Sequence, residues 1–315
     1  MPVPSLLARA FTAEVPGPPL PPGPRTNPWA RAGAVPAPPG SAEAALLADL
    51  WGARGHHLRA DGTPSAVPRR AVPSAGAAYP VQWHVLVPAG TDSALRPGRY
   101  VLGADGLLRR PGEVPDGPRV ALVVSVQPGR TFGRYRHRAW PLWVADAAYA
   151  VEAVRFVVPG AEPATTEMGA VRRDLGVSRA SDTAWWLRRG LVPELALARV
   201  DLPPGWAVDG LRRAVLGARR SPSLARFAAG AGCPEAAAPA AQSGQDWVRG
   251  ATAVRCWERP ALADYTGLWR AHREAARACY DAVASGVGVR PVSGFVLPSG
   301  TPPLLHALAL LEDPA

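Results

Sequence analysis

A short loop of small residues is the part of this sequence best suited to chemistry. The segment 69–87 reads RRAVPSAGAAYPVQWHVLV, in which Pro, Ser, Ala and Gly at 73–78 precede Tyr79, Pro80 and a strand-like stretch. Small side chains let backbone N–H groups approach a flat ligand closely, and Ser74 adds a hydroxyl group. Such a loop can cradle the edge of a ring or an anion. It can equally be a tight turn into the strand, and the residues alone leave both interpretations open.

Two arginine-rich segments could supply the charges of a site. The segment 130–140 reads RTFGRYRHRAW, and the segment 219–227 reads RRSPSLARF. Two arginines followed by a hydroxyl group suit a dianionic phosphate, because guanidinium groups bind phosphate oxygens through paired hydrogen bonds. The alternative interpretation of 219–227 is a basic turn between two helices.

The overall charge does not by itself indicate a nucleic-acid partner. The 315 residues carry a formal charge of +10, and all 35 basic residues are arginine because the sequence has no lysine. The arginines are scattered or paired, whereas nucleic-acid binding favours a basic patch or stripe, so we predict no nucleic-acid partner. The hydrophobic fraction of 48% is enough for a packed core and excludes a fully disordered chain.

Neither a metal site nor a membrane span is predicted. The three cysteines lie at spacings that fit neither a disulfide framework nor a zinc motif. The pair His56–His57 lacks a suitably spaced third ligand and is interpreted as a polar turn after a helix. No apolar run reaches the ~18 residues of a membrane helix, and the N-terminus does not resemble a signal peptide. We therefore predict a cytoplasmic protein.

Hydrophobic periodicity predicts helices interspersed with strands. Ser41 is a good N-cap for a helix that ends at Gly52 or Gly55. The run 142–158 is apolar nearly all round, which is typical of a helix buried in a core or an interface. Short β-rich runs, and a hairpin around the turn 104–106, predict strands. These strands are expected at 81–88, 100–102, 107–108, 119–126 and 193–202.

This order of elements favours a mixed α+β layered fold. A Pro-rich arm at 1–40 can wrap the protein, space it or bind a partner. It precedes a domain at 41–207, and the composition then shifts at 208. In the C-terminal region, 208–315, we predict a long helix at 261–286, followed by one strand-like run and a short apolar helix at the end of the chain.

The order and spacing of these features resemble a known family over roughly residues 42–202. A helix ending LLADLWGARG, the loop PSAGAAYP, the hairpin GRYVLGADGLLRRPGE and the arginine-rich segment 130–140 before a buried helix follow one another. This order is similar to the flavin-dependent nitroreductase superfamily. Within it, the sequence most resembles the SagB-like azoline dehydrogenases of thiazole- and oxazole-containing peptide biosynthesis, a group that includes thiopeptide biosynthesis.

The resemblance implies an α+β fold with a mixed sheet flanked by helices and a buried helix at a homodimer interface. It implies FMN as the cofactor, held by the loop residues Ser74, Ala75 and Gly76, with Arg70 before them. The reaction would be the two-electron oxidation of a thiazoline or oxazoline in a modified precursor peptide. Cyclodehydratase proteins would be the partners.

Two departures from the family pattern concern the base and the phosphate. The family's Lys-Tyr pair falls on Arg134–Tyr135, so Tyr135 becomes the candidate catalytic base, with Arg134 lowering its pKa. The alternative is that Tyr135 is an ordinary interfacial aromatic, and His137 is then the next candidate base. The family's Arg-Arg-Ser start is missing, and its nearest equivalent is Arg219–Arg220–Ser221. These residues begin a degenerate second repeat, reach the flavin phosphate through the fold, or form only a turn.

Two other functions remain open on the sequence alone. One is a general flavin reductase of nitro or quinone compounds that takes electrons from NAD(P)H, because one fold can serve several functions. The other is a non-catalytic member that acts as a scaffold in a peptide-modifying complex. The region 208–315 can also be a dimerisation extension.

Overall fold

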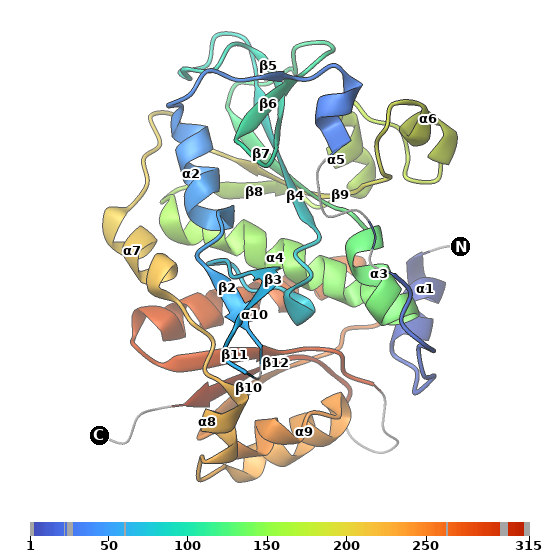
Figure 1. The fold of residues 1–315 in the computed structure, drawn as a ribbon, viewed down its shortest axis with the longest axis vertical. Coiled ribbons are helices and arrows are strands. Elements are labelled where there is room, and N and C mark those ends of the chain that lie inside the picture. The colour runs from blue at the N-terminus through green and yellow to red at the C-terminus, as the bar shows by residue number, and fades with distance from the viewer. Residues whose placement is uncertain are drawn as a thin grey trace.

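The chain forms two antiparallel sheets with two long helices between them (Figure 1). The computed structural model describes residues 3–21, 23, 28–59, 61–262, 264–296 and 302–311. Helix α4 (Ala139–Val157) packs against the larger sheet and helix α10 (Tyr265–Ala284) against the smaller one. The two helices also pack against each other. The layers are therefore sheet, helix, helix and sheet.

The larger sheet has seven strands in the order β1-β6-β5-β4-β7-β9-β8, and the smaller has the order β10-β12-β11. The α+β fold class predicted from the sequence is confirmed. The sheet was expected to be mixed, but its described strands all pair antiparallel, because neighbours such as β4, β5 and β6 follow one another through hairpins. The strands of the larger sheet are β1 (Val35–Pro36), β4 (Val81–Val87), β5 (Gly98–Leu102), β6 (Leu107–Arg110), β7 (Ala121–Val126), β8 (Glu162–Thr165) and β9 (Leu195–Asp201).

The predicted strands and the predicted apolar helix at 142–158 agree with the structure. Strands β4 and β7 are buried along their whole length, as their largely apolar runs indicate, and the burial includes the polar residues Gln82, His84 and Ser125. The hairpin turn closes where Gly103 N–H donates to the Gly106 carbonyl oxygen at 2.7 Å. Ser41 caps helix α2 (Ala42–Trp51) by accepting from the Ala44 N–H, so a local side-chain bond sets the start of that helix.

Helix α10 covers the apolar helix α4 within one chain. The carboxylate of Glu152, only 1% exposed, accepts from Arg155 at 2.9 Å and from Arg273 of α10 at 2.5 Å. The Tyr280 hydroxyl of α10 donates to the Tyr149 carbonyl oxygen of α4. The buried helix of the sequence analysis is thus covered by its own C-terminal region. Its apolar character consequently gives no reason for a second subunit, and the homodimer stays a prediction.

The C-terminal region corrects two expectations. The short apolar helix predicted at the end of the chain is strand β12 (Leu304–Leu311), which lies between β10 (Ala253–Glu258) and β11 (Gly288–Val292). Leucine and alanine favour helices locally, but pairing on both edges and burial on both faces override that propensity. His56 and His57, expected in a turn, begin β2 (His56–Leu58), which pairs with β3 (Pro64–Pro68) in an exposed hairpin.

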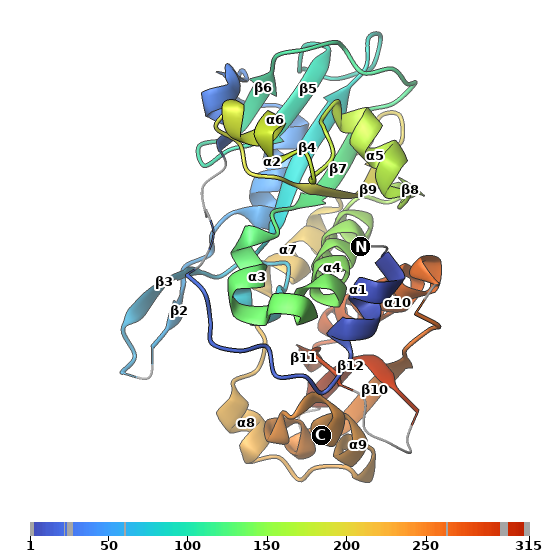
Figure 2. The same ribbon diagram turned by 90° about the vertical axis from the view of Figure 1, so that its right-hand side faces the viewer.

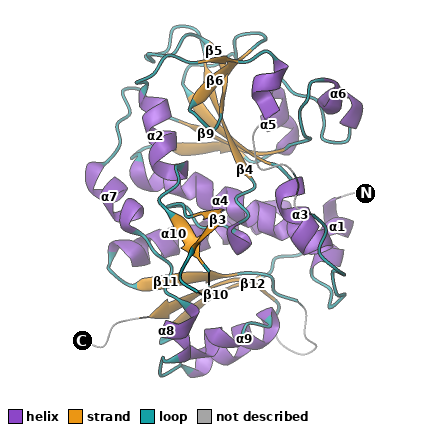
Figure 3. Cartoon of the chain, viewed as in Figure 1, coloured by secondary structure: helices purple, strands orange, loops and turns teal. Residues whose placement is uncertain are grey.

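Short helices complete the fold (Figure 3). In the described ranges, no helix is both long enough and apolar enough to cross a lipid bilayer. The helices not yet named are α1 (Val3–Ala10), η1 (Pro28–Ala32), η2 (Ala75–Ala77), α3 (Gly129–Tyr135), η3 (Arg136–Arg138), α5 (Met168–Leu175), α6 (Thr183–Arg188), α7 (Gly210–Ala218), α8 (Leu224–Ala228), η4 (Pro234–Ala236), α9 (Ala237–Ser243) and η5 (Asp246–Gly250).

Candidate functional site

The small-residue loop is folded into a strained turn rather than a simple entry into strand β4. Gly76, Ala77 and Tyr79 have φ values of 56°, 54° and 46°. A left-handed conformation suits glycine, whereas each residue with a Cβ atom loses roughly 1–2 kcal/mol there. Backbone strain of this kind concentrates at ligand and active sites, where the surrounding structure enforces it. This strain makes the loop a candidate ligand site.

Asp146 of helix α4 holds this turn in place. Its carboxylate accepts from the Ser74 hydroxyl at 2.8 Å and from the Ala75 N–H at 3.0 Å. The Ser74 oxygen in turn accepts from the Tyr79 N–H at 2.9 Å. Asp146 is only 4% exposed, and burial raises its pKa to about 7 although the two hydrogen bonds lower it. A buried carboxylate thus connects the long helix to the strained loop.

The sequence analysis did not select Asp146. A signal was present, because Asp146 and Glu152 are the two acidic residues in the run 142–158, whose only other charged residue is Arg155. A charged residue on a buried helix requires a hydrogen-bonding partner. The partner, Ser74, is 72 residues away in the chain, so the sequence could have indicated the need for a partner but not its identity.

Tyr135 at the end of helix α3 packs directly on the loop. A Cβ atom built at Gly76 would lie 2.1 Å from the Tyr135 hydroxyl oxygen and 3.0 Å from Nη1 of Arg134. The Arg134 guanidinium carbon lies 5.4 Å from the centre of the Tyr135 ring, within the range of a cation–π contact. The structure therefore brings both predicted catalytic residues, Arg134 and Tyr135, against the predicted cofactor loop.

The structure corrects the expected chemistry of Tyr135 in two respects. Segment 134–138 is the end of α3 followed by η3, so Arg134, Arg136 and Arg138 do not line one face beside Tyr135 as alternate residues of a strand would. Burial raises the pKa of Tyr135 above its usual 10, and Arg134 lowers it by less. A buried phenol in this setting keeps its proton at neutral pH and is suited to donate a hydrogen bond rather than to act as a base.

The titration of Tyr135 gives a direct check. The near-ultraviolet absorbance difference between the wild type and Tyr135→Phe is expected to show phenolate only above pH 10, because burial disfavours the charged form. Arg134→Met is expected to move that step to still higher pH, since the guanidinium group lowers the pKa. A Tyr135 titration below pH 10 would restore this residue as a candidate base.

Arg219 reaches the segment just before this loop from the C-terminal region. Its Nε donates to the Ala71 carbonyl oxygen at 2.8 Å, and Nη1 donates to the Ser221 hydroxyl at 3.0 Å. Arg219 is 8% exposed although it follows helix α7 at the molecular surface. The Arg-Arg-Ser segment therefore lies beside the chain that leads into the small-residue loop, and its contact with a flavin phosphate stays a prediction.

Other arginines gather around this contact. The Arg70 guanidinium lies 5.2 Å from the ring centres of both Trp51 and Tyr79, and its buried Nε has no hydrogen-bond partner. Arg220 points elsewhere: its Nη1 donates to the carbonyl oxygens of Gly217 and Arg219. Partial burial and the positive charges of Arg69, Arg54 and Arg219 lower the pKa of Arg220.

This group of cations lacks local compensation. Among the described residues, no carboxylate lies within ion-pair distance of Arg69, Arg70, Arg219 or Arg220. Like charges held together in a partly buried setting are costly unless an anion joins them. Phosphate is an anion that several guanidinium groups bind well. The arrangement can therefore hold an anionic group beside the loop.

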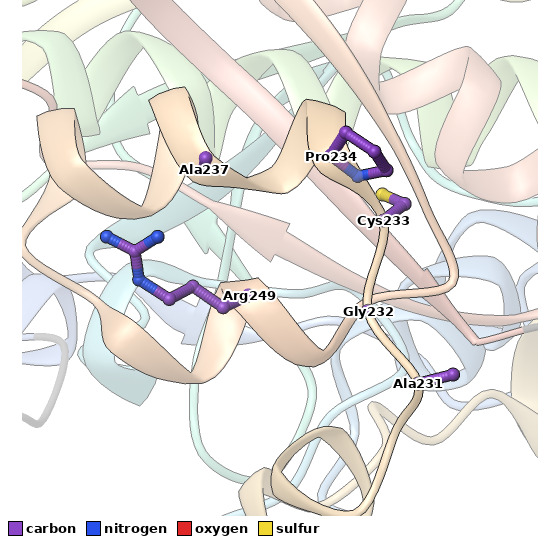
Figure 4. Close-up of a pocket in the computed structure, with 6 residues that line it drawn as sticks. All are labelled: Ala231, Gly232, Cys233, Pro234, Ala237 and Arg249. Carbon is purple, nitrogen blue, oxygen red and sulfur yellow. The ribbon is translucent and has the colours of Figure 1, made fainter.

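A separate hollow lies far from this constellation (Figure 4). It has a volume of about 330 Å³ and lies between η4 and η5 at the end of the molecule that carries α8 and α9 (Figure 1). Burial raises the pKa of the Cys233 thiol on its wall, which disfavours the reactive thiolate. None of the predicted site residues lines the hollow, whose lining is Ala231, Gly232, Cys233, Pro234, Ala237 and Arg249.

The comparisons with known proteins agree with the architecture. The fold is similar to that of a protein described as a nitroreductase from Anabaena variabilis ATCC 29413, with a TM-score of 0.59 and 14% sequence identity. The similarity covers 84% of this chain and 86% of the other. The chain has a nitroreductase-like fold. No family model and no curated protein sequence matches it.

In this nitroreductase-like fold the candidate site is assembled from four parts of the chain. They are the loop 73–80, the end of α3, the middle of α4 and the turn after α7. Predicted residues Ser74, Ala75, Gly76, Arg134 and Tyr135 meet there, and Arg219 contacts Ala71 just before the loop. In the part of the chain that is described, no cluster of three or more His, Cys, Asp or Glu side chains is arranged to hold a metal ion.

Proposed function

We propose that the chain is an FMN-dependent oxidoreductase. The observation that supports this most is the hydrogen bond from the buried Arg219 to the Ala71 carbonyl oxygen, two residues before the loop in which Gly76, Ala77 and Tyr79 are strained. A flavin mononucleotide has a flat ring and a dianionic phosphate, and these are the two chemical features that such a loop and such arginines suit. The orphaned Nε of Arg70 is a further donor beside the loop. The residues present therefore fit this cofactor.

In the proposal each group of residues has one task. Arg219, Ser221 and Arg70 hold the phosphate, with Arg220 adding positive charge nearby. The backbone of Ser74, Ala75 and Gly76 faces the ring, and Asp146 positions that backbone from behind. The bound flavin would supply a two-electron acceptor, while the protein supplies position and electrostatics.

The proposed substrate is a thiazoline or oxazoline in a modified precursor peptide, which is oxidised to the aromatic ring. This finer assignment rests on the sequence resemblance to the SagB-like branch. Tyr135 lies against the loop and keeps its proton, so its role here is to donate a hydrogen bond that orients the peptide ring. Arg134, stacked beside it, holds the phenol in place.

Two alternatives are separated by simple measurements. A general reductase of nitro or quinone compounds would oxidise NAD(P)H rapidly when such an acceptor is added, whereas an azoline dehydrogenase would not. A non-catalytic scaffold would bind no flavin, and the freshly purified protein would then be colourless. Cyclodehydratase partners are expected if the protein is an azoline dehydrogenase or a scaffold in the peptide-modifying complex.

The decisive test is the affinity for FMN. We expect the wild type to bind FMN saturably in a fluorescence titration. Arg219→Met is expected to weaken binding about 10- to 150-fold, since a hydrogen bond to a charged group contributes roughly 1.5–3 kcal/mol. Arg213→Met is the matched control, because it removes the same charge from helix α7 at an exposed position paired with Asp49.

The same titration can refute the proposal. Equal affinities for the wild type and Arg219→Met would remove Arg219 from the phosphate site. No binding by the wild type at high FMN concentration would favour the scaffold.

A homodimer is proposed on the resemblance alone, since flavin sites of the family are formed by two subunits. Light scattering at micromolar concentration is expected to give twice the mass of 33.0 kDa. A monomer would contradict the dimer and agree with the way α10 already covers α4 within one chain.

A further inference from the structure

The Pro-rich arm lies against the outer side of helix α3 and η3 (Figure 2). The arm donates the N–H groups of Leu20 and Gly23 to the carbonyl oxygens of Gly133 and Gly129, both at 2.8 Å. In the other direction, Arg136 donates to the Pro18 carbonyl oxygen at 2.8 Å and Arg138 to that of Glu14 at 3.0 Å. All four contacts use the main chain of the arm.

Glycines make this close approach possible. Gly129 and Gly133 are one turn apart on α3, so they share a face of the helix. A Cβ atom at Gly133 would lie 3.0 Å from the Leu20 carbonyl oxygen and 2.9 Å from that of Pro21. A Cβ atom at Gly23 would lie 2.5 Å from the Gly129 carbonyl carbon. Backbone therefore packs on backbone, and the fit is specific for an extended chain.

The arm side chains contribute little to this contact. Val15 is 80% exposed and Leu20 is 44% exposed. A polyproline-like chain has no internal hydrogen bonds, so its N–H and C=O groups are free to bind a partner. Another chain with the same extended conformation can present the same groups.

The charge of this surface indicates the kind of chain that would replace the arm. Arg136 and Arg138, which bind the arm, form no ion pair with a carboxylate among the residues that are described. The Glu14 side chain pairs with Arg9 of helix α1 instead. A peptide with free carboxylates would gain from these guanidinium groups.

We propose that the outer face of α3 and η3 is a docking site for an extended, proline-rich peptide segment with acidic side chains from another polypeptide, which the arm fills in its absence. The opposite side of α3 carries Tyr135 against Gly76, so a peptide docked here lies on the element that also forms the candidate site. This polypeptide would be the peptide substrate if the proposed function is correct. Docking itself does not depend on the proposed function, because it needs no flavin.

The test releases the arm without changing the docking surface. The double variant Leu20→Pro/Gly23→Val removes one N–H donor and places a side chain against Gly129. A fluorescein-labelled synthetic peptide with the sequence of residues 12–23 is then titrated by fluorescence anisotropy. We expect saturable binding to the full-length variant and at least 10-fold weaker apparent binding to the wild type, because a tethered arm competes at an effective concentration of ~1 mM.

Two controls test whether the Leu20 N–H group is needed for docking. Leu20→Ala keeps the N–H group, so its arm stays docked and the protein is expected to behave as the wild type. The same peptide methylated at the Leu20 nitrogen is expected to bind the double variant about 5- to 10-fold more weakly, since one hydrogen bond contributes roughly 1 kcal/mol. Raising the salt concentration should weaken binding as well, because the surface is cationic.

Three outcomes would overturn the proposal. They are the absence of saturable binding to a variant with a native circular dichroism spectrum, equal binding by the wild type and the variant, and no effect of methylation. If the double variant does not fold, hydrogen–deuterium exchange of the wild type is measured in place of the titration. Excess unlabelled peptide should then speed exchange in the arm fragment, and an unchanged rate would refute docking. Each readout is independent of FMN, so it can fail while the flavin assignment holds.

Discussion

Replacing Asp146 by alanine is expected to abolish the ordered cofactor loop and with it most of the affinity for FMN. The variant leaves the Ser74 hydroxyl and the Ala75 N–H without their acceptor. Each unsatisfied buried group costs about 1–3 kcal/mol, so we expect a loss of ~2–4 kcal/mol in the free energy of unfolding. FMN should bind about 10²-fold more weakly, because the strained backbone at Ala77 and Tyr79 relaxes once its anchor is gone.

Asp146→Asn is the matched control. The amide oxygen can still accept from Ala75, and the amide nitrogen can donate to the Ser74 oxygen. We expect this variant to bind FMN with nearly wild-type affinity. If Asp146→Ala does the same, the carboxylate does not position the loop.

The pH dependence of the free energy of unfolding distinguishes the wild type, with its carboxyl group at Asp146, from the Asp146→Asn variant. In the unfolded chain Asp146 loses its proton near its ordinary pKa of 3.8, whereas in the folded protein its pKa is about 7. Between these values the folded state binds the additional proton, so stability falls as pH rises from about 4 to 7. The asparagine variant carries no such proton and should gain stability relative to the wild type over this range. Urea denaturation at pH 5 and pH 8 measures the difference.

Gly76→Val is expected to produce the second large effect. The branched side chain would occupy a left-handed position with φ of 56° and would overlap the Tyr135 hydroxyl. We expect loss of FMN binding and a decrease of ~3–4 kcal/mol in the free energy of unfolding, with the fold retained. Visible absorbance and chemical denaturation measure the two effects. Unchanged flavin content would show that the loop is only a turn.

A double-mutant cycle separates the two causes of this destabilisation, which are the left-handed backbone and the overlap with the Tyr135 hydroxyl. Gly76→Ala keeps the backbone strain but places its Cβ atom 2.1 Å from the Tyr135 oxygen and 3.2 Å from the ring carbon that bears it. In the Tyr135→Phe background the oxygen is gone, so we expect about 1 kcal/mol of the loss to be recovered. Gly62→Ala controls for strain alone, because Gly62 has φ of 80° and open space around it. If the effects of Gly76→Ala and Tyr135→Phe on the free energy of unfolding are additive, the Tyr135 hydroxyl does not restrict the side chain at position 76.

The elements that the sequence predicted well are those whose local pattern matches their final environment. Strands β4 and β7 and helix α4 are largely apolar in sequence, and both strands and most of the helix are buried. The cap at Ser41 and the hairpin turn before Gly106 depend on neighbouring residues only. The end of the chain shows the opposite case, because β12 is a strand through pairing with β10 and β11, which its leucines and alanines do not encode locally.

The candidate site shows the same division between local pattern and tertiary contact. The sequence by itself determined the α+β class, the small-residue loop and the arginines that could serve it, since these follow from composition and spacing. Only the tertiary structure decided that Arg219 reaches Ala71 across 148 residues and that Asp146 anchors Ser74. It also decided that the pKa of Tyr135 rises, because burial opposes the neighbouring charge and exceeds it. Desolvation and long-range hydrogen bonds depend on what surrounds a group in space, and no local pattern records that.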